Sequence, residues 1–311
     1  RGFALWLHFD FSSVRIPLMK LQYECLTCII AQVLNVAKML NFDEAHKEAA
    51  MRESLAYLSG ANYEGCTPES MGELWGLLLK HAETGDPYAA VKSLCNQEAM
   101  KMESHVRQAI LDSADPLGRA LKFAVAGNLV DYGLEHPVSL EEQNRQVDEI
   151  AATPFVVDDS LKLKEALRKA ETLLYLCDNA GEILFDKLLI EEIRREFPQI
   201  QATCVVKGTP VLNDVTMADA LEVGLDQAAR VIDNGDGCPG TVLHRTSESF
   251  RREYEAADIV ISKGQGNFES LTGQPKANIF FLFMAKCDAI CQIVGTSKLS
   301  MLCKKNEPHS N

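Results

Sequence analysis

One stretch near the middle of the chain, residues 172–185, constrains the fold more than any other. Its first half, Thr172–Cys177, is an apolar run of strand length that breaks into Asp178, Asn179 and a glycine. From Glu182 onward, apolar residues recur at helical spacing. A buried strand that turns into a helix is typical of α/β sheets, which bind ligands at the carboxyl ends of their strands. The stretch predicts an α/β fold with a ligand site here, and a simple helix cap is the alternative.

Strand-like and helix-like segments alternate through the second half of the chain, after Pro154. Such alternation predicts a mostly parallel, Rossmann-like sheet covered by helices on both faces, which makes three layers. The expected strands are 172–177, 201–206, 230–232, 258–262 and 278–283, and the main expected helices between them are 182–197, 217–223 and 246–256.

The first half of the chain, from Tyr23 to about Ile150, has a helical pattern throughout. Apolar stripes at helical spacing are separated by short turns, as in a helical bundle. We therefore expect residues 19–150 to form an all-helical subdomain and residues 151–303 to form an α/β domain. The irregular residues 1–18 are expected to be an extension outside the fold, and residues 304–311 a polar tail.

Composition excludes several classes of partner. Among 311 residues, 44 are acidic and 31 are basic, which gives a formal charge of −13. This balance argues against binding to nucleic acid or to an anionic membrane, and no apolar run is long enough to span a bilayer. The ten cysteines are scattered and no secretory signal is recognisable, so we expect a reducing cytoplasm. A few well-placed lysines would still suffice for a phosphate ligand.

A second strand end resembles the first. Residues 201–206 form an apolar run, and Asp214 follows a few residues later, before another helical segment. If the two strands are neighbours, Asp178, Asn179 and Asp214 meet in one crevice. Carboxylate and amide oxygens are ligands that Mg²⁺ and Mn²⁺ prefer. The pattern indicates a divalent-metal site, although Asp214 alone would also serve as a helix cap.

Two lysines follow apolar strands in the same manner. Lys263 precedes the glycine-containing segment 264–269, and Lys286 comes shortly after the run 278–283. An ammonium group beside exposed backbone N–H groups is suited to bind phosphate. The alternatives are an ordinary turn after Lys263 and a solvent-reaching stem at Lys286.

The cysteine pair Cys25-x-x-Cys28 is the one cysteine spacing with a recognised meaning. Zinc would need two further ligands, and no second Cys-x-x-Cys or histidine pair accompanies this one. A redox pair normally follows a strand, whereas this pair begins a helix. We therefore expect a structural role.

Together these segments resemble the damage-control phosphatase family, a former domain of unknown function akin to the acidic-residue methyltransferase-like proteins. The resemblance covers residues from Met19 to about Gly295 and is closest to the prokaryotic branch with an N-terminal Cys-x-x-Cys. Several long motifs in the right order are more specific than any single one. The motifs are Cys25–Cys28, Asp86–Lys92, Ala126–Gly133, Asp178–Glu182, Leu212–Asp214, Lys263–Glu269 and Ala285–Cys287.

The resemblance implies a phosphatase that uses a divalent metal, Mg, Mn, Co or Ni, to hydrolyse phosphomonoesters such as sugar phosphates or damaged metabolites. Its small phosphorylated substrate would be the main partner. By resemblance, Asp178, Asn179 and Asp214 bind the metal. Asp178, Asp214 and Lys286 are the expected catalytic residues, with Asp178, Asp214 and Glu182 as candidates for the general base. The expected substrate contacts are Asn128, Asp131, Glu182, Lys263 and Asn267.

One departure from the family pattern concerns Phe283. Members with an Arg-x-x-Lys form of the last motif have arginine at this position, so their substrate range does not transfer. Two other function classes stay open. A carboxyl methyltransferase that uses S-adenosylmethionine would also be α/β, but the first strand here lacks the usual Gly-x-Gly turn. A non-catalytic phosphate-binding protein would share the crevice without turnover.

Overall fold

The computed structural model of the chain describes residues 19–82, 84–130, 132, 136 and 138–308. Within these residues, seven strands form one sheet in the order β1-β7-β6-β5-β2-β3-β4. The strands from β6 to β4 run parallel, whereas β7 is antiparallel to β6. The strands are β1 (Val157–Asp158), β2 (Thr172–Leu176), β3 (Gln201–Val206), β4 (Arg230–Asp233), β5 (Ile259–Lys263), β6 (Ile279–Met284) and β7 (Met301–Lys305). The predicted mostly parallel sheet is therefore confirmed.

Helices surround this sheet, and several of them start at N-cap residues of the types that commonly cap helices. The side chains of Asp43, Asp115, Ser139 and Ser247 each accept a hydrogen bond from the first turn that follows. The helices are α1 (Tyr23–Met39), α2 (Glu44–Ser59), α3 (Thr67–Leu79), α4 (Ala89–Leu111), α5 (Pro116–Ala126), α6 (Leu140–Ala152), α7 (Ser160–Leu167), α8 (Glu182–Glu196), α9 (Met217–Glu222), α10 (Leu225–Ala228), the 3₁₀ helix η1 (Leu243–Arg245), α11 (Glu248–Ala256), α12 (Gln265–Leu271) and α13 (Asp288–Val294). Within the described residues, no helix is both long and apolar enough to cross a membrane.

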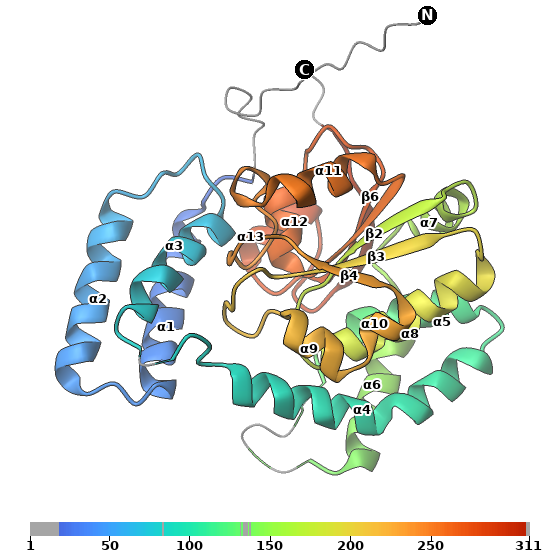
Figure 1. The fold of residues 1–311 in the computed structure, drawn as a ribbon, viewed down its shortest axis with the longest axis horizontal. Helices are drawn as coiled ribbons and strands as arrows, with labels where there is room; N and C mark the ends of the chain where they lie inside the picture. Colours follow the sequence, from blue (N-terminus) through green and yellow to red (C-terminus); the bar gives the residue numbers. More distant parts are fainter. Residues whose placement is uncertain (1–18, 83, 131, 133–135, 137, 309–311) are drawn as a thin grey trace, which may run out of the picture.

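The sheet is the middle of three layers (Figure 1). Successive side chains of β2 point to opposite faces: Leu173 and Tyr175 pack in the core beneath α5 and α8, and Leu174 and Leu176 in the core beneath α11, α12 and α13. Because both faces of the central strands are covered, β2, β5 and β6 are almost fully buried. This burial explains why each of them is an uninterrupted apolar run in the sequence.

The helices of the first half divide between two cores. Helices α4, α5 and α6 share the core of the sheet with α8, whereas α1, α2 and α3 enclose a separate core. Helix α3 packs against α12, and the indole of Trp75 donates a 2.8 Å hydrogen bond to the carbonyl of Pro210, in the loop after β3. The helices α1–α3 are thereby attached near the carboxyl edge of the sheet.

The far edge of the sheet differs from the expectation. Strand β7 runs to Lys305, past the start of the predicted tail at residue 304. The buried side chain of Asn306 then donates to the carbonyls of Gln274 and Lys276 at 2.8 and 2.9 Å. Strand β1 was not expected either. Strand β1 has only two residues and forms the edge, whereas β7 lies between β1 and β6 and has three apolar residues followed by two lysines. Neither strand therefore has the long apolar run that marks a central strand. The predicted extension, residues 1–18, lies outside the described residues.

Candidate active site

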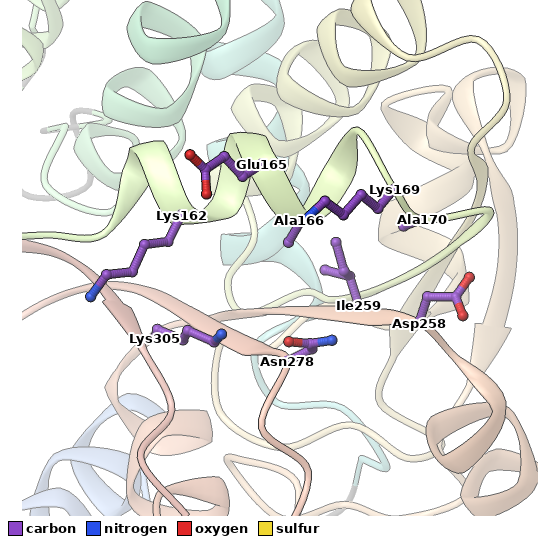
Figure 2. Close-up of a pocket in the computed structure, with 9 residues that line it drawn as sticks. All are labelled: Lys162, Glu165, Ala166, Lys169, Ala170, Asp258, Ile259, Asn278 and Lys305. Atoms are coloured by element: carbon purple, nitrogen blue, oxygen red, sulfur yellow. The ribbon is translucent and has the colours of Figure 1, made fainter.

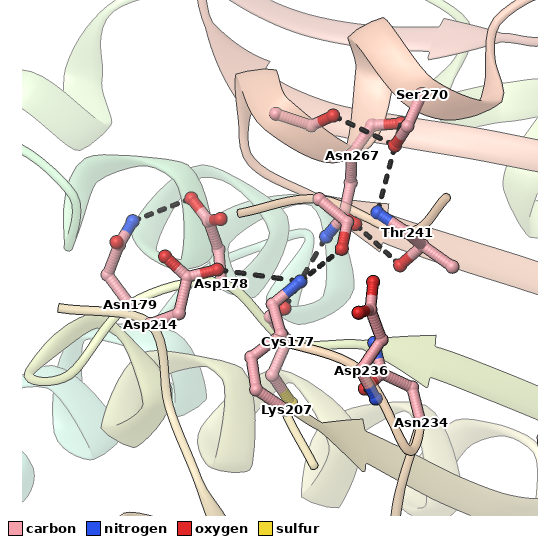
Figure 3. A network of polar contacts seen from close by, with 12 residues as sticks. Cys177, Asp178, Asn179, Lys207, Asp214, Asn234, Asp236, Thr241, Asn267 and Ser270 are labelled. Carbon is pink, nitrogen blue, oxygen red and sulfur yellow. Dashed lines mark hydrogen bonds and ion pairs between the residues drawn. The ribbon is translucent and has the colours of Figure 1, made fainter. Parts of the chain in front are cut away.

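The carboxyl ends of β2 and β3 bring together the three predicted metal ligands. The two strands are paired neighbours, and the loops that leave them form a short bridge between Asn179 and Asp214. The amide of Val215 donates to the carbonyl of Asp178 at 2.9 Å. These main-chain contacts place the side chains of Asp178, Asn179 and Asp214 close together, at the carboxyl edge of the sheet (Figure 3).

Both carboxylates of this group are buried, with exposed fractions of 9% for Asp178 and 4% for Asp214. Asp178 Oδ2 accepts a 2.6 Å hydrogen bond from Asn179 Nδ2. Asp214 Oδ2 has no hydrogen-bond partner among the residues that the structure describes, and Lys207 Nζ lies 3.4 Å from it in a buried ion pair. Gly264 allows this packing, because a Cβ atom there would lie 1.9 Å from Asp178 Oδ2.

The negative charges of Asp178 and Asp214 are only partly compensated by nearby cations. Burial raises the pKa of Asp178 to about 8, and the nearby carboxylates of Glu182 and Asp214 add to the effect. Burial also raises the pKa of Asp214 to about 6, although Lys207 opposes this rise. Buried carboxylates that repel one another favour a bound cation. The residues therefore fit a divalent ion, which Asp178, Asn179 and Asp214 would hold.

The donor set is unusual in its composition. Within the described residues, no three His, Cys, Asp or Glu side chains form a group that could hold a metal ion. The predicted set includes two such side chains and one amide, so the amide oxygen of Asn179 would have to complete it. Oxygen-only sets of this kind suit Mg²⁺ or Mn²⁺, which retain several water ligands.

Glu182 lies next to the group of Asp178, Asn179 and Asp214, in the first turn of α8. Its side chain is buried, and both of its oxygens have partners. Oε1 accepts from Lys263 Nζ at 2.6 Å. Oε2 accepts from the amide nitrogens of Asn128 and Asn179, the latter at 3.1 Å. Glu182 therefore connects several predicted site residues and has no oxygen directed to an open space.

Lys263 does not lie where a phosphate would contact it. Its side chain is fully buried, and Nζ donates to Ala124 O at 2.7 Å, Glu182 Oε1 at 2.6 Å and Asp186 Oδ1 at 2.5 Å. An ammonium group has three N–H donors, and all three are used. The following segment is the helix α12, rather than an exposed turn. The expected substrate contact of Lys263 is thus replaced by an internal one.

Asn267 is also internal. Its Nδ2 donates to the carbonyl of Lys263 at 2.8 Å and to that of Cys177 at 3.4 Å, while its Oδ1 accepts from Thr241 Oγ1 at 2.7 Å (Figure 3). These bonds connect the start of α12 with the end of β2. The structure therefore gives Asn267 a role in holding the strand ends together, and its contact with the substrate stays a prediction.

Lys286 and Asn128 contact each other on the solvent-exposed side of the group of Asp178, Asn179 and Asp214. Lys286 is exposed, its Nζ donates to Asn128 Oδ1, and its backbone N–H donates to Gln265 Oε1 at 3.0 Å. Asn128 Nδ2 in turn donates to Asp178 Oδ2 at 3.4 Å, so Asn128 connects Lys286 with Asp178. The positive charge of Lys286 opposes the rise in the pKa of Asp178. Asp131, predicted from the same motif as Asn128, lies outside the described residues.

Comparison with known proteins identifies the family. A family model described as the damage-control phosphatase ARMT1-like domain matches residues 21–302. The chain belongs to this family. A damage-control phosphatase of Pyrococcus horikoshii is 34% identical over 93% of this chain and 99% of its own length. A damage-control phosphatase of Archaeoglobus fulgidus is 30% identical over 92% of this chain and 99% of its own length.

The fold of this family member agrees with a solved relative. The crystal structure of a DUF89 family protein from Pyrococcus horikoshii superimposes with a TM-score of 0.87 and 31% sequence identity. The match covers 93% of this chain and all of that one. The fold and the family expected from the motifs are therefore both confirmed.

Sequence reasoning missed two buried groups of this damage-control phosphatase family member. Lys207 directly follows β3 and Lys263 is the last residue of β5, and this shared position at a strand end was a usable signal. Asp186, one helical turn after Glu182, accepts from Lys263 and from the hydroxyl of Tyr175 at 2.6 Å. Its spacing placed it on the same helix face as Glu182, but a carboxylate on a helix is usually exposed.

A cleft of about 450 Å³ lies at the opposite edge of the sheet, where the strands begin (Figure 2). Its three lysines are accompanied by two acidic residues, and the carboxylate of Asp258 already accepts bonds from the backbone of residues 171 and 172. The paired carboxylates are not among its lining residues, so the chemistry expected of the family does not belong here. The lining residues are Lys162, Glu165, Ala166, Lys169, Ala170, Asp258, Ile259, Asn278 and Lys305.

The cysteine pair lies in the first turns of α1. Cys25 is buried, Cys28 is exposed, and both thiols are free, as are the other eight in the chain. Burial raises the pKa of the Cys25 thiol, so it is protonated at neutral pH and a poor metal ligand or nucleophile. This environment supports a structural role for Cys25.

Replacing the pair tests this role. We expect the double variant Cys25→Ser with Cys28→Ser to keep its catalytic turnover within a few-fold of wild type. Any loss should appear in the melting temperature, because Cys25 packs in the core of α1–α3. Stoichiometric zinc that co-purifies with wild type and disappears from the double variant would contradict the expectation.

Proposed function

We propose that this protein is a metal-dependent phosphatase that hydrolyses phosphomonoesters, either sugar phosphates or damaged phosphometabolites. The observation that carries the proposal is the group of Asp178, Asn179 and Asp214 at the carboxyl edge of the sheet, with both carboxylates buried, the amide half-buried, and Lys286 beside them. Buried oxygen ligands next to a lysine suit a bound cation and a phosphate together. The relatives named as damage-control phosphatases support the same reaction class.

Each residue of the group would have a distinct role. Asp178, Asn179 and Asp214 would hold a divalent ion, Mg, Mn, Co or Ni, which supplies a Lewis acid for the phosphoryl oxygen and orients a water molecule. Lys286 would offset the charge that develops on the phosphoryl oxygens. Glu182 is a poor candidate for the general base, since both of its oxygens are occupied. Asp178 and Asp214 are the better candidates.

The substrate range of this protein is a separate matter. Phe283, at the position where other members have arginine, is buried and stacks on Phe268 with ring centroids 4.6 Å apart. Position 283 therefore contributes no cation to the substrate.

We place the chain in the prokaryotic branch of the family, in a cytoplasm whose reducing conditions suit ten free cysteines.

The decisive experiment is a metal titration against phosphate release. The protein is stripped with a chelator, and Mg²⁺, Mn²⁺, Co²⁺ or Ni²⁺ is returned in the presence of a panel of sugar phosphates. We expect no release of inorganic phosphate in the chelator and recovery on adding metal. Methyl transfer from S-adenosylmethionine to a carboxylate would favour the methyltransferase. Metal and phosphate binding without turnover on any substrate would favour the binding protein.

A substitution at Lys286 tests its role in the transition state. We expect Lys286→Met to lower kcat by about 10²–10³, since a preorganised donor to the developing charge is lost. Metal affinity and melting temperature should barely change, because the side chain is exposed and methionine keeps most of its stem. The measurements are steady-state kinetics, metal titration and thermal melting.

The matched control is Lys162→Met, in the cleft at the opposite edge of the sheet. Lys162 is also exposed and forms a 2.7 Å ion pair with Asp159, so its loss should leave kcat unchanged. Equal kinetics for the Lys286 variant and wild type would show that Lys286 is an ordinary surface lysine.

A further inference from the structure

The carboxylate of Glu182 is a junction between the metal-binding group and Lys286. An ionised carboxylate only accepts hydrogen bonds. Lys263 Nζ donates to one oxygen of Glu182, Oε1. The other oxygen, Oε2, faces the side-chain amides of Asn128 and Asn179. Asn128 and Asn179 both direct their Nδ2 atoms to this oxygen.

The position of this carboxylate is fixed from behind. Lys263 only donates hydrogen bonds, and its two other acceptors are the carbonyl of Ala124 on α5 and Asp186 on α8. The hydroxyl of Tyr175 on β2 also donates to Asp186. The side chains of Tyr175, Asp186 and Lys263 are completely buried, and Glu182 is 2% exposed. Elements from three parts of the fold therefore hold Glu182 in one place.

This arrangement determines which way each amide turns. A side-chain amide that directs its N–H₂ group to an acceptor must direct its carbonyl oxygen elsewhere. For Asn128, that oxygen accepts from Lys286 Nζ. For Asn179, the oxygen is left for the metal, which binds oxygen and cannot bind an amide N–H. Asp178 Oδ2 accepts from the same two Nδ2 atoms, at 2.6 Å from Asn179 and 3.4 Å from Asn128, so it supports the same orientation. Asp178 would itself bind the metal, whereas Glu182 Oε2 has only the two amides as partners among the described residues and orients both groups.

We propose that Glu182, held by Lys263, is a positioning residue that orients the amide of Asn179 toward the metal and the amide of Asn128 toward Lys286. The inference rests on the proposed function for the identity of the metal and the substrate. It assigns to Glu182 and Lys263 neither proton transfer nor substrate contact. Their effect is exerted through the two asparagines.

The first test removes the acceptor and keeps the shape. In Glu182→Gln, Lys263 still requires an oxygen, so the new N–H₂ group faces the two asparagine N–H₂ groups. This donor–donor repulsion acts against the hydrogen bonds that both asparagines keep to Asp178 Oδ2 and favours a turn of each amide. We expect the affinity for Mn²⁺ alone, measured by calorimetry without substrate, to fall by about 10- to 100-fold, as is typical when an outer partner of a metal ligand is lost. Thermal melting of the metal-free variant checks that it is folded.

The matched control is Glu192→Gln on the same helix. Glu192 is also buried and pairs with Arg195, but none of its hydrogen bonds reaches the site. Its Mn²⁺ affinity should equal that of wild type. If Glu182→Gln also binds Mn²⁺ as wild type does, the positioning role is wrong.

A compensating variant tests the donor and acceptor roles directly. Asn179→Asp in the Glu182→Gln background lets the new amide donate to the carboxylate introduced at position 179, whose second oxygen stays with the metal. We expect Mn²⁺ affinity to return to at least the wild-type value, whereas kcat stays low because Asn128 is still turned. The gain in Mn²⁺ affinity caused by Asn179→Asp should be at least about tenfold larger in the Glu182→Gln background than in wild type. Such non-additivity is expected when two residues are in contact. Equal gains in both backgrounds would overturn the inference.

A measurement on metal-free wild type separates this inference from the proposed function. The side-chain N–H₂ protons of Asn128 and Asn179 should exchange slowly with solvent, as followed by NMR, because both donate to a buried carboxylate. Rapid exchange would overturn the positioning role even in an active phosphatase. Slow exchange in a protein that neither binds Mn²⁺ nor releases phosphate would support the positioning geometry and reject the proposed function. This measurement also applies if Glu182→Gln does not fold.

Discussion

Asp178→Ala and Asp214→Ala should each abolish metal-dependent phosphate release while the protein remains folded. Each variant removes one of the two carboxylates that would bind the ion, and the remaining ligands are too few to replace it. Folding should survive, because burial raises the pKa of both groups and makes their ionised forms unfavourable in the fold. Removing either one relieves the repulsion among Asp178, Glu182 and Asp214.

The measurements for these variants are phosphate release with saturating Mn²⁺, metal affinity, and melting temperature without metal. Asp233→Ala is a matched control, since Asp233 is the last residue of β4 in the same sheet but is exposed. Among the described residues, its side chain accepts a hydrogen bond only from the backbone N–H of Gly235, at 2.9 Å. It should keep wild-type activity. Phosphate release by wild type in excess chelator would reject the metal-dependent reaction altogether.

The central part of the fold was predictable because its strands are buried on both faces. β3 matches its expected range, and β2, β5 and β6 differ from theirs by a residue or so at each end. Because β2 and β3 are parallel neighbours, the residues that follow them, Asp178 and Asp214, lie at the same edge of the sheet. Strands β1 and β7 were missed because β1 has only two residues and β7 has only three apolar residues before two lysines, which is too few for a strand to be recognised.

The direction of a strand-end side chain was harder to predict. Lys263 shares a strand face with Ile259 and Ile261, and that face packs beneath α5 and α8. Alternation along β5 determines that these three residues point the same way, but the sequence does not show which face holds the acidic partners. Glu182 and Asp186 are recognisable as partners only once α8 is placed beside β5. The sequence therefore located the lysine at a strand end but did not reveal the buried partners of its ammonium group.

The most severe loss of stability is expected for Lys263→Met. Methionine fills nearly the same volume, so the change removes the ammonium group and leaves Glu182 and Asp186 buried without a cation. Burial alone would lower the pKa of Lys263, but Asp186 and Glu182 raise it above its ordinary value, so the lysine is charged in the fold. Breaking a buried ion pair from one side typically costs about 3–5 kcal/mol. Urea denaturation with matched wild type measures this difference in the free energy of unfolding.

The pH dependence of this loss follows from the carboxylates. Burial raises the pKa of Asp186 to about 6 even though Lys263 opposes the rise, so losing the lysine must raise that pKa further. An acid whose folded pKa exceeds its unfolded value binds more protons in the fold, and stability then falls as pH rises between the two values. The deficit of Lys263→Met should therefore be larger at pH 8 than at pH 5. Lys298→Met, which breaks an exposed 2.8 Å pair with Asp288, should cost at most about 1 kcal/mol at either pH. Similar costs for the two lysine variants would show that the buried network around Lys263 contributes no more than a surface pair.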